Sequence, residues 1–150
     1  MPRWPKRKPR AGVDEYGRTP LWKLAFAGDE DGVRRELEAG AEPSAGDDAG
    51  YTPLHIAVQE RHTGTVKLLL QSGADPNSFD KYGNGPLWTA VYWAYRSDRT
   101  DANLSIVKLL LRGGANADHE NAAGRTPRDF AMEAGDEPLK SLFTGGHKPA

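Results

Sequence analysis

The chain has 150 residues, with 20 lysines and arginines against 21 aspartates and glutamates, and no cysteine. The lack of cysteine excludes disulfide bonds and thiolate metal sites. No apolar run approaches the ~18 residues that a membrane-spanning helix needs, and prolines follow the basic start where a signal peptide has an apolar stretch, so we expect a soluble protein of the cytoplasm.

Residues 1–12 differ in composition from the rest of the chain. They hold five lysines and arginines and no acid, which leaves 15 basic and 21 acidic residues, a net charge of −6, for the remainder. The segment is polar and interrupted by prolines, so we predict a disordered basic tail over 1–12. Such a tail could be a nuclear import signal, an arm that contacts phosphates, or a solubilising segment only.

A short motif then recurs at a fixed spacing. Its first three copies, Thr19-Pro20-Leu21, Thr52-Pro53-Leu54 and Gly85-Pro86-Leu87, are evenly spaced along the chain. A fourth copy, Thr126-Pro127, comes later than this spacing predicts, by an insertion of eight. Repetition at a period of about 33 residues predicts stacked supersecondary units in place of a single globular core.

Each copy carries the signals of a turn followed by two helices. A glycine precedes each motif where the chain must reverse, and the threonines are placed to cap a helix with proline at its first position. Apolar stripes such as 66–70 and 106–111 mark the second helices, which should end at Gly40, Gly73 and Gly113-Gly114. The predicted units are 14–46, 47–79, 80–120 and 121–143, with a frayed C-terminus over 144–150.

The two end units are more polar than the two inner ones. Arg34 and Arg35 lie where the second unit has an apolar stripe, and Arg128-Asp129 replaces Leu54-His55. Terminal repeats need a polar outer face because no further unit stacks on them. We therefore expect two internal units between two caps, in a complete repeat array.

The second copy is the most complete, and it resembles a known family. Residues 47–57 read Asp-Asp-Ala-Gly-Tyr-Thr-Pro-Leu-His-Ile-Ala, which contains the Thr-Pro-Leu-His-x-Ala signature of ankyrin repeats. The resemblance covers about residues 14 to 143. It implies an all-α solenoid of four helix-turn-helix units with hairpin-like tips, and a protein-binding scaffold. In this family the partner usually contacts a concave face made of the tips and the first helices.

We find no set of residues suited to catalysis or metal binding. The resemblance gives His55 the task of fastening neighbouring loops by hydrogen bonds, and gives His62 a structural role too. His119 and His147 have no second ligand at metal-binding spacing, and neither a nucleophile elbow nor a phosphate loop occurs. We predict a non-catalytic protein with no cofactor, no metal and no small-molecule substrate.

The candidate partner-binding residues are those that the resemblance places on the tips and the exposed side of the first helices. They are rich in aromatic side chains, which are frequent hot spots because they bury a large area with few rotatable bonds. The third unit is the predicted centre. Trp22 and Trp88 replace the histidine of the signature, and packing against adjacent units is the alternative for both. The set is Tyr16, Arg18, Phe26, Asp48, Tyr51, Gln59, Glu60, Lys81, Tyr82, Asn84, Trp88, Tyr92, Trp93 and Arg96.

The insertion of eight residues falls around 95–103, between the two helices of the third unit. Extra loop length costs little closure entropy, so the insertion could be tolerated without any function. Insertions in repeat proteins also cluster on binding faces, and this one adjoins the aromatic helix. We interpret it as a loop that is a secondary contact for the partner.

Two functions fit the sequence. In the first, the chain binds a partner protein and blocks or sequesters it. Residues 80–111 resemble small bacterial ankyrin proteins of toxin systems, which are immunity proteins that cover a toxin's active site, and the acidic body would suit a basic toxin domain. In the second, the chain is a nuclear or nucleic-acid-associated adaptor that uses its basic tail. Five cations attract nucleic acid only weakly and in a salt-dependent way, so we do not expect nucleic acid as the partner.

Overall fold

The computed structural model describes residues 10–96 and 101–144, and these residues form eight α-helices and no β-strand. The helices come in pairs, and the first helix of each pair begins at the predicted proline. Their bounds are α1 Pro20–Ala27, α2 Glu30–Glu38, α3 Pro53–Gln59, α4 Thr63–Gln71, α5 Pro86–Arg96, α6 Asp101–Arg112, α7 Pro127–Glu133 and α8 Glu137–Thr144. The predicted all-α solenoid of four helix pairs is confirmed.

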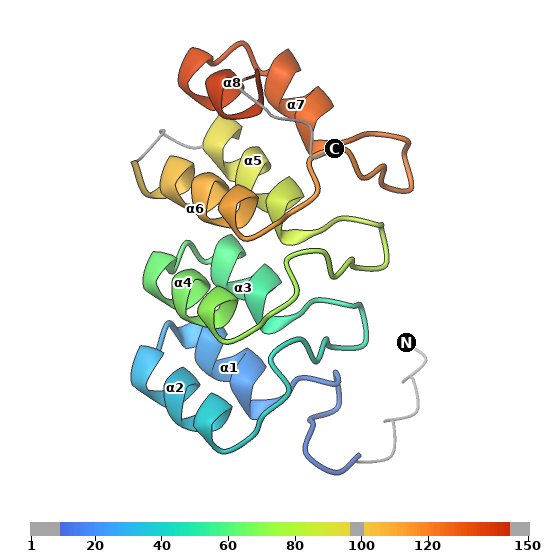
Figure 1. Ribbon diagram of the computed structural model, residues 1–150. Helices are drawn as coiled ribbons and strands as arrows, with labels where there is room; N and C mark the ends of the chain where they lie inside the picture. The colour runs from blue at the N-terminus through green and yellow to red at the C-terminus, as the bar shows by residue number, and fades with distance from the viewer. Residues whose placement is uncertain (1–9, 97–100, 145–150) are drawn as a thin grey trace.

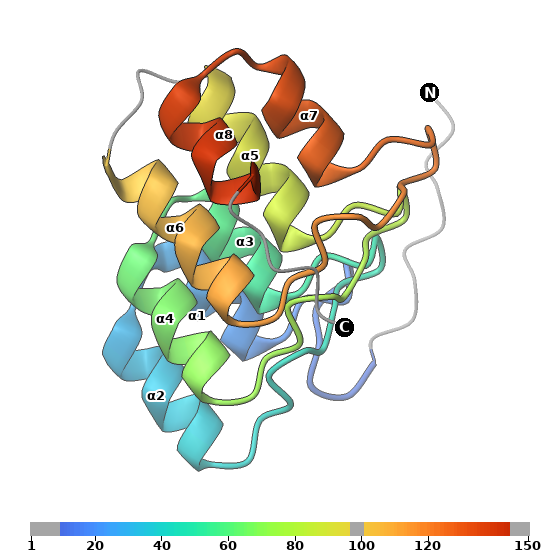
Figure 2. The ribbon, with the colours of Figure 1, turned by 45° about the horizontal axis from the view of Figure 1, so that its top comes forward.

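The four pairs stack in chain order (Figure 1). The first helices pack in one row, α1 on α3, α3 on α5 and α5 on α7, while α2, α4, α6 and α8 form a second row behind them. The tips all project to the same side of the stack, beyond the first helices (Figures 1 and 2). We call the surface formed by the tips and the exposed side of the first helices the concave face.

Local signals set the ends of the helices. The Thr19 hydroxyl accepts a hydrogen bond from the backbone N–H of Trp22 at 3.0 Å, and threonines cap α3 and α7 in the same way. Such a cap is worth about 1 kcal/mol of helix stability. The second helices of the first three units end just before glycines with positive φ, namely Gly40, Gly73 and Gly114.

One apolar core runs through the whole stack. Each unit adds similar side chains from both of its helices, and the most buried of them are no more than 2% exposed. Burying one such side chain is worth roughly 1.5–3 kcal/mol. Because each layer contacts only its neighbours, this repeated core, with no single centre, holds the units together. Its repeated members include Leu21, Leu54 and Leu87 from the first helices and Val33, Val66 and Val107 from the second.

The insertion in the third unit lengthens its helices. α5 has 11 residues against 7 in α3, α6 has 12 against 9 in α4, and the connection grows from 60–62 to 97–100. These differences of four, three and one residue account for all eight inserted residues. The prediction of a loop over 95–103 is therefore wrong at both ends, since helix continues to Arg96 and resumes at Asp101. Ala94 is buried, so the extra turn of α5 joins the core. Residues 97–100 lie outside the described residues.

The two ends of the chain fall mostly outside the described residues, which excludes 1–9 of the predicted tail and 145–150 of the predicted frayed end. The described chain begins at Arg10, and its guanidinium lies 2.5 Å from a carboxylate oxygen of Asp48 in the second tip. α8 continues to Thr144, one residue beyond the predicted boundary. Arg10, within the predicted tail, thus contacts the second tip of the repeats.

Candidate protein-binding surface

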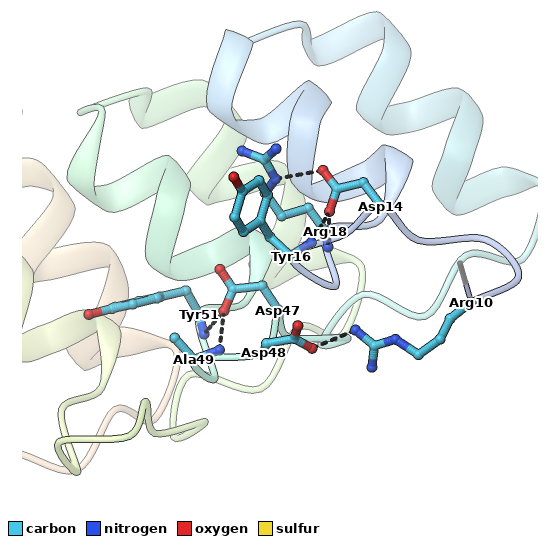
Figure 3. A network of polar contacts seen from close by, with 8 residues as sticks. All are labelled: Arg10, Asp14, Tyr16, Arg18, Asp47, Asp48, Ala49 and Tyr51. Atoms are coloured by element: carbon cyan, nitrogen blue, oxygen red, sulfur yellow. Dashed lines mark hydrogen bonds and ion pairs between the residues drawn. The ribbon is translucent and has the colours of Figure 1, made fainter. Parts of the chain in front are cut away.

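The four tips share one hydrogen-bond pattern, which fixes their backbone. In the second tip, Asp47 Oδ1 accepts hydrogen bonds from the backbone N–H groups of Ala49 and Tyr51 at 3.0 and 2.9 Å (Figure 3). The Asp47 N–H donates in turn to the Tyr51 carbonyl at 2.9 Å. A short carboxylate or amide at this position therefore orders the turn. The matching residues of the other tips are Asp14, Asp80 and Asn121.

Successive tips are also bonded to one another. The backbone N–H of Asp48 donates to the Tyr16 carbonyl at 3.0 Å, and the same contact recurs from Lys81 to Ala49 and from Ala122 to Tyr82, both at 2.9 Å. Each such bond comes from the neighbouring unit, so a side chain on one tip keeps its position relative to the next. The tips therefore form a continuous, ordered edge of the concave face.

His55 fastens the second unit to the third. Its Nδ1 lies 3.1 Å from the backbone N–H of Thr52, and its Nε2 lies 3.0 Å from the carbonyl oxygen of Asn84. These partners fix the ring as the neutral tautomer with the proton on Nε2. Burial lowers the pKa of His55 below its ordinary value. The predicted structural role of His55 is confirmed, and His62 makes a similar link to the carbonyl oxygen of Phe26 at 3.0 Å.

In the first unit, an arginine lies between aromatic rings. The Arg18 guanidinium lies 4.7 Å from the centre of the Tyr16 ring, and its Nε donates to Asp14 at 2.7 Å (Figure 3). The centre of the Trp22 ring lies 5.3 Å from the same guanidinium. Burial raises the pKa of Asp14, but hydrogen bonds from the Arg18 backbone and side chain outweigh it and hold that pKa well below its usual range. Trp22 stacks on Phe26 at 5.9 Å.

Four candidates of the second unit lie on or beside the concave face. Tyr51 is half-buried, with its ring edge-on to His55 at 5.8 Å, and burial raises the pKa of its hydroxyl. Asp48 is exposed but already bonded to Arg10 (Figure 3). Gln59 is exposed and Glu60 is half-buried, at the C-terminal end of α3.

The third unit carries an aromatic cluster whose centre is a residue of the fourth unit. The rings of Trp88, Tyr92 and Tyr95 surround Phe130 of α7, at 5.4, 6.3 and 5.5 Å between centroids. Trp88 stacks on Phe130 and is half-buried, and Trp22 is only 8% exposed. For Trp88 the structure favours the alternative of packing between units, whereas Trp22 stacks on Phe26 of its own unit.

The remaining aromatic candidates of this unit are solvent-accessible. Tyr82 stands on the third tip with Lys81 over its ring at 5.0 Å. Trp93 is half-buried beside Tyr92, with ring centroids 5.5 Å apart, and Arg96 lies over Tyr92 at 5.5 Å. On the extended α5, an exposed rim therefore borders the packed centre.

Asn84 has a structural task in addition to its place near the tip. Its carbonyl accepts from His55, its N–H donates to Asp80, and its side-chain oxygen accepts from Asn121 Nδ2 at 3.0 Å. These bonds join three successive units. Substitution of the Asn84 side chain should thus disturb the stack as well as the candidate surface.

The repeated tips, capped helix pairs and inter-unit histidine define a repeat fold, and comparison with known proteins identifies it. A model of ankyrin repeats in three copies matches residues 6–80, and the model of the single ankyrin repeat matches residues 82–122. The chain belongs to the ankyrin repeat family. Proteins of this family are typically non-catalytic, and the repeats indicate a protein–protein interaction module.

Curated relatives of this ankyrin repeat chain match only part of it. An ankyrin repeat-containing protein of Schizosaccharomyces pombe and the potassium channel AKT1 of Arabidopsis thaliana are each 42% identical to it over 43 residues, which is 29% of the chain. The matched stretch covers 21% of the first protein and 5% of the second. The similarity therefore concerns the repeat and not the whole of either protein.

Two residues of the ankyrin stack that complete the aromatic surface were not predicted from the sequence. Phe130 occupies the position of Ile56 in the second unit, where an apolar residue predicts only core. Arg61 lies over the Trp93 ring at 5.4 Å although it belongs to the preceding unit. Its position beside the end of α3 was a signal, but the sequence does not show that Trp93 of the following unit, which was predicted on the first helix, lies against it.

Two further features are absent from residues 10–96 and 101–144. In this part of the chain, no three histidine or acidic side chains cluster in a way that could hold a metal ion. None of the helices described there has the length and apolar character to cross a membrane.

Proposed function

We propose that this ankyrin repeat chain is a non-catalytic inhibitor that acts in the cytoplasm, binding a partner protein through its concave face and covering part of the partner's surface. The observation that carries the proposal is the exposure of aromatic side chains on the third unit. Tyr82 is 53%, Tyr92 37% and Tyr95 50% exposed. Large exposed apolar side chains gathered on one surface are typical of protein-binding sites.

The surface is ordered before any partner arrives. Tyr82 stands on a tip that is bonded internally and to the next unit, and Tyr92 stands on a helix anchored by buried Val91 and Ala94. Binding therefore need not immobilise the backbone that carries these rings, which removes part of the entropic cost of association. Such preorganisation favours long-lived complexes.

Alanine substitution tests where the partner binds. Once a partner has been isolated with the full chain, Tyr82→Ala and Trp93→Ala should each weaken binding by about thirtyfold, the value that ~2 kcal/mol for a hot spot implies. Lys67→Ala and Lys108→Ala, which change exposed residues of the second helices, are the matched controls. If both aromatic variants keep full affinity, the interface lies elsewhere.

A narrower form of the proposal names the partner. We propose a protein toxin, encoded beside this chain, whose active site the chain covers. The likeness of residues 80–111 to immunity-type ankyrin proteins supports this. Neutralisation requires slow dissociation, and differences between related complexes lie mostly in dissociation rates, so the central aromatic side chains should control it.

The narrower proposal is tested by growth. Cells that express the neighbouring gene should stop growing, and co-expression of this chain should restore growth. A Tyr82→Ala, Trp93→Ala double variant should fail to rescue, while a Lys67→Ala, Lys108→Ala double variant should succeed. If the neighbouring gene is harmless, or if its toxicity persists with the wild-type chain, the proposal of a toxin partner is wrong. The broader proposal of a protein-binding module is not affected by that result.

A further inference from the structure

The cations that lie over aromatic rings in this protein are of two kinds. Arg18 is the first kind, since it covers two rings and is paired with Asp14. A cation of the second kind lies over one aromatic ring but forms no ion pair with any described residue. All three cations of this kind lie on or against the third unit, and they are Arg61 over Trp93, Lys81 over Tyr82 and Arg96 over Tyr92.

Arg18 shows what a completed site of this kind looks like here. The guanidinium carbon lies over the rings of Tyr16 and Trp22, and Nε donates to the Asp14 carboxylate at 2.7 Å. A planar guanidinium can do both at once, because stacking leaves its in-plane N–H groups available. At the third unit, rings and cations lie together in the same way. Among the described residues, however, no carboxylate forms an ion pair with these cations as Asp14 does with Arg18.

Arg61 occupies a position that two other units give to glycine. Its φ is 60°, and the matching residues of the first and last units, Gly28 and Gly135, both have φ of 71°. A side chain other than glycine is strained in this conformation, and such strain persists where a residue has a task. The conformation itself serves to end α3, because the N–H groups of Arg61 and His62 donate to the carbonyls of Val58 and Ala57 at 3.0 and 2.9 Å. Glycine has the same conformation in the end units without strain, so capping does not account for the arginine side chain.

The insertion supplies the ring that lies beneath Arg61 and a second arginine. The extra turn of α5, residues 93–96, contains Trp93 and Arg96 and has no counterpart in α3 or α7. Tyr92 and Trp93 meet edge-on at 5.5 Å, with Arg96 over the first ring and Arg61 over the second. Two guanidinium groups from different units therefore flank one pair of aromatic rings.

We propose that Arg61, Arg96 and Lys81, with the rings beneath them, receive the carboxylates of an acidic segment of the partner protein. The inference rests on the proposed function and makes its contact more specific. It also replaces the basic partner expected from the net charge of −6. That charge belongs to the body as a whole and influences the rate of approach, whereas the contacts are made by these cations.

Charge also favours a protein over a nucleic acid at this surface. A nucleic acid presents a continuous row of phosphates, which the acidic body would repel beyond the few cations of the third unit. An acidic segment of a protein places only a few carboxylates on these cations. A nucleic acid ligand is therefore an alternative outcome of the experiment.

The experiment selects ligands without knowledge of the partner. Linear dodecapeptides displayed on phage are selected on the full chain, and the enriched peptides are synthesised with a fluorescent label. Their affinities are compared for wild type, for Arg61→Gln with Arg96→Gln, and for Arg35→Gln with Arg112→Gln. The last pair lies exposed on α2 and α6 without rings and removes the same charge. Labelled oligothymidylate is measured in parallel.

We expect peptides enriched in Asp and Glu, binding at least about tenfold weaker in the Arg61, Arg96 variant and nearly unchanged in the control. Arg61→Gly, which restores the residue of the end units, should lower affinity without lowering the unfolding temperature. A lower unfolding temperature of this variant would indicate that Arg61 has a structural role only.

Four outcomes overturn the inference: no binding peptide, no enrichment in acidic residues, equal loss in both double variants, or tighter binding of oligothymidylate that depends on Arg61 and Arg96. Failure of this inference can be distinguished from failure of the proposed function. If Tyr82→Ala and Trp93→Ala abolish binding of the isolated partner while the arginine variant keeps it, the concave face binds protein but not an acidic segment.

Discussion

The imidazole of His55 bonds to the carbonyl oxygen of Asn84, 29 residues further along the chain, at 3.0 Å. The first and third units have Trp22 and Trp88 in place of His55. Trp22 cannot reproduce the bond, because its buried Nε1 has no hydrogen-bond partner among the described residues. At the junction of the third and fourth units, the stack of Trp88 on Phe130 replaces this polar link. In the described chain, the junction of the second and third units alone combines a buried histidine with a bonded carbonyl.

This junction should make stability depend on pH. Burial lowers the pKa of His55 in the folded protein relative to about 6.5 in the unfolded chain. The unfolded state therefore binds the proton more readily, and stability is full above about pH 6.5 and falls as the pH drops below it. Protonation would also point an Nδ1 proton at the N–H of Thr52.

Thermal unfolding at pH 7.5 and 5.0 measures the effect. His55→Gln keeps a side-chain donor but does not titrate, so its unfolding temperature should fall less over this interval than that of wild type. At pH 7.5 the variant should be less stable by about 1–3 kcal/mol, the cost of disturbing a buried hydrogen bond. Equal falls in both proteins would show that His55 is not the group responsible.

The close approach of successive tips gives a second prediction. A Cβ at Gly83 would lie 3.1 Å from the Cα of Asn121, and the φ of Gly83 is 76°. Gly124 has a similar φ of 71° but open space around it. Gly83→Ala should therefore cost more stability than Gly124→Ala, because strain from positive φ is common to both and the collision is not. Chemical denaturation of both variants measures the difference, and equal losses would contradict it.

The sequence predicted the repeat fold well because its signals are local. Thr19, Thr52 and Thr126 cap helices through contacts within four residues, and the apolar stripes repeat at helical spacing. The length of α5 was not predictable in this way. Nothing local separates a helical Tyr95-Arg96 from a loop, since burial of Ala94 against other helices decides the matter.

The candidate surface was predictable in position but not in its contacts. Aromatic residues at tips and first helices were identified from the repeat register, yet Trp88 turned out to stack on Phe130 of the following unit. Arg128 shows the same limit. The sequence predicted a polar outer face, but its guanidinium bonds inward, to Asp118 and to the Phe143 carbonyl. Such contacts depend on which unit lies next to which.

The Trp88–Phe130 stack should couple the third unit to the fourth. Truncating either ring removes buried contacts at their junction, so Trp88→Ala and Phe130→Ala should each destabilise the protein. The double variant should lose less than the sum, by about 0.5–1.5 kcal/mol for the pair itself. Chemical denaturation of the four proteins gives this coupling energy. Additive losses would show that the rings do not interact.

Arg128 should hold the last helix pair against the stack. It takes the position of Leu21, Leu54 and Leu87, and its Nε and one terminal nitrogen bond to the two Asp118 oxygens at 2.7 and 3.1 Å. Its other nitrogen donates to the Phe143 carbonyl near the end of α8. The hydrogen bond to Asp118 raises the pKa of Arg128, so the link is charged at every working pH.

Arg128→Leu restores the residue type of the other units and tests whether this link outweighs apolar packing. Asp118 is more than half exposed, so solvent screens the pair and we expect a loss of only about 1 kcal/mol. The loss should be local, because units of a repeat stack open separately. Amide exchange in α8 should accelerate several-fold, while exchange in α3 and α4 stays constant.

Salt separates the electrostatic link from packing. In wild type, raising the salt concentration should accelerate exchange in α8 toward the rate of the variant, whose own rate should change little. Arg112→Leu, an exposed arginine on α6, should leave α8 exchange as in wild type at low salt. If Arg128→Leu slows exchange, apolar packing outweighs the ion pair at this position.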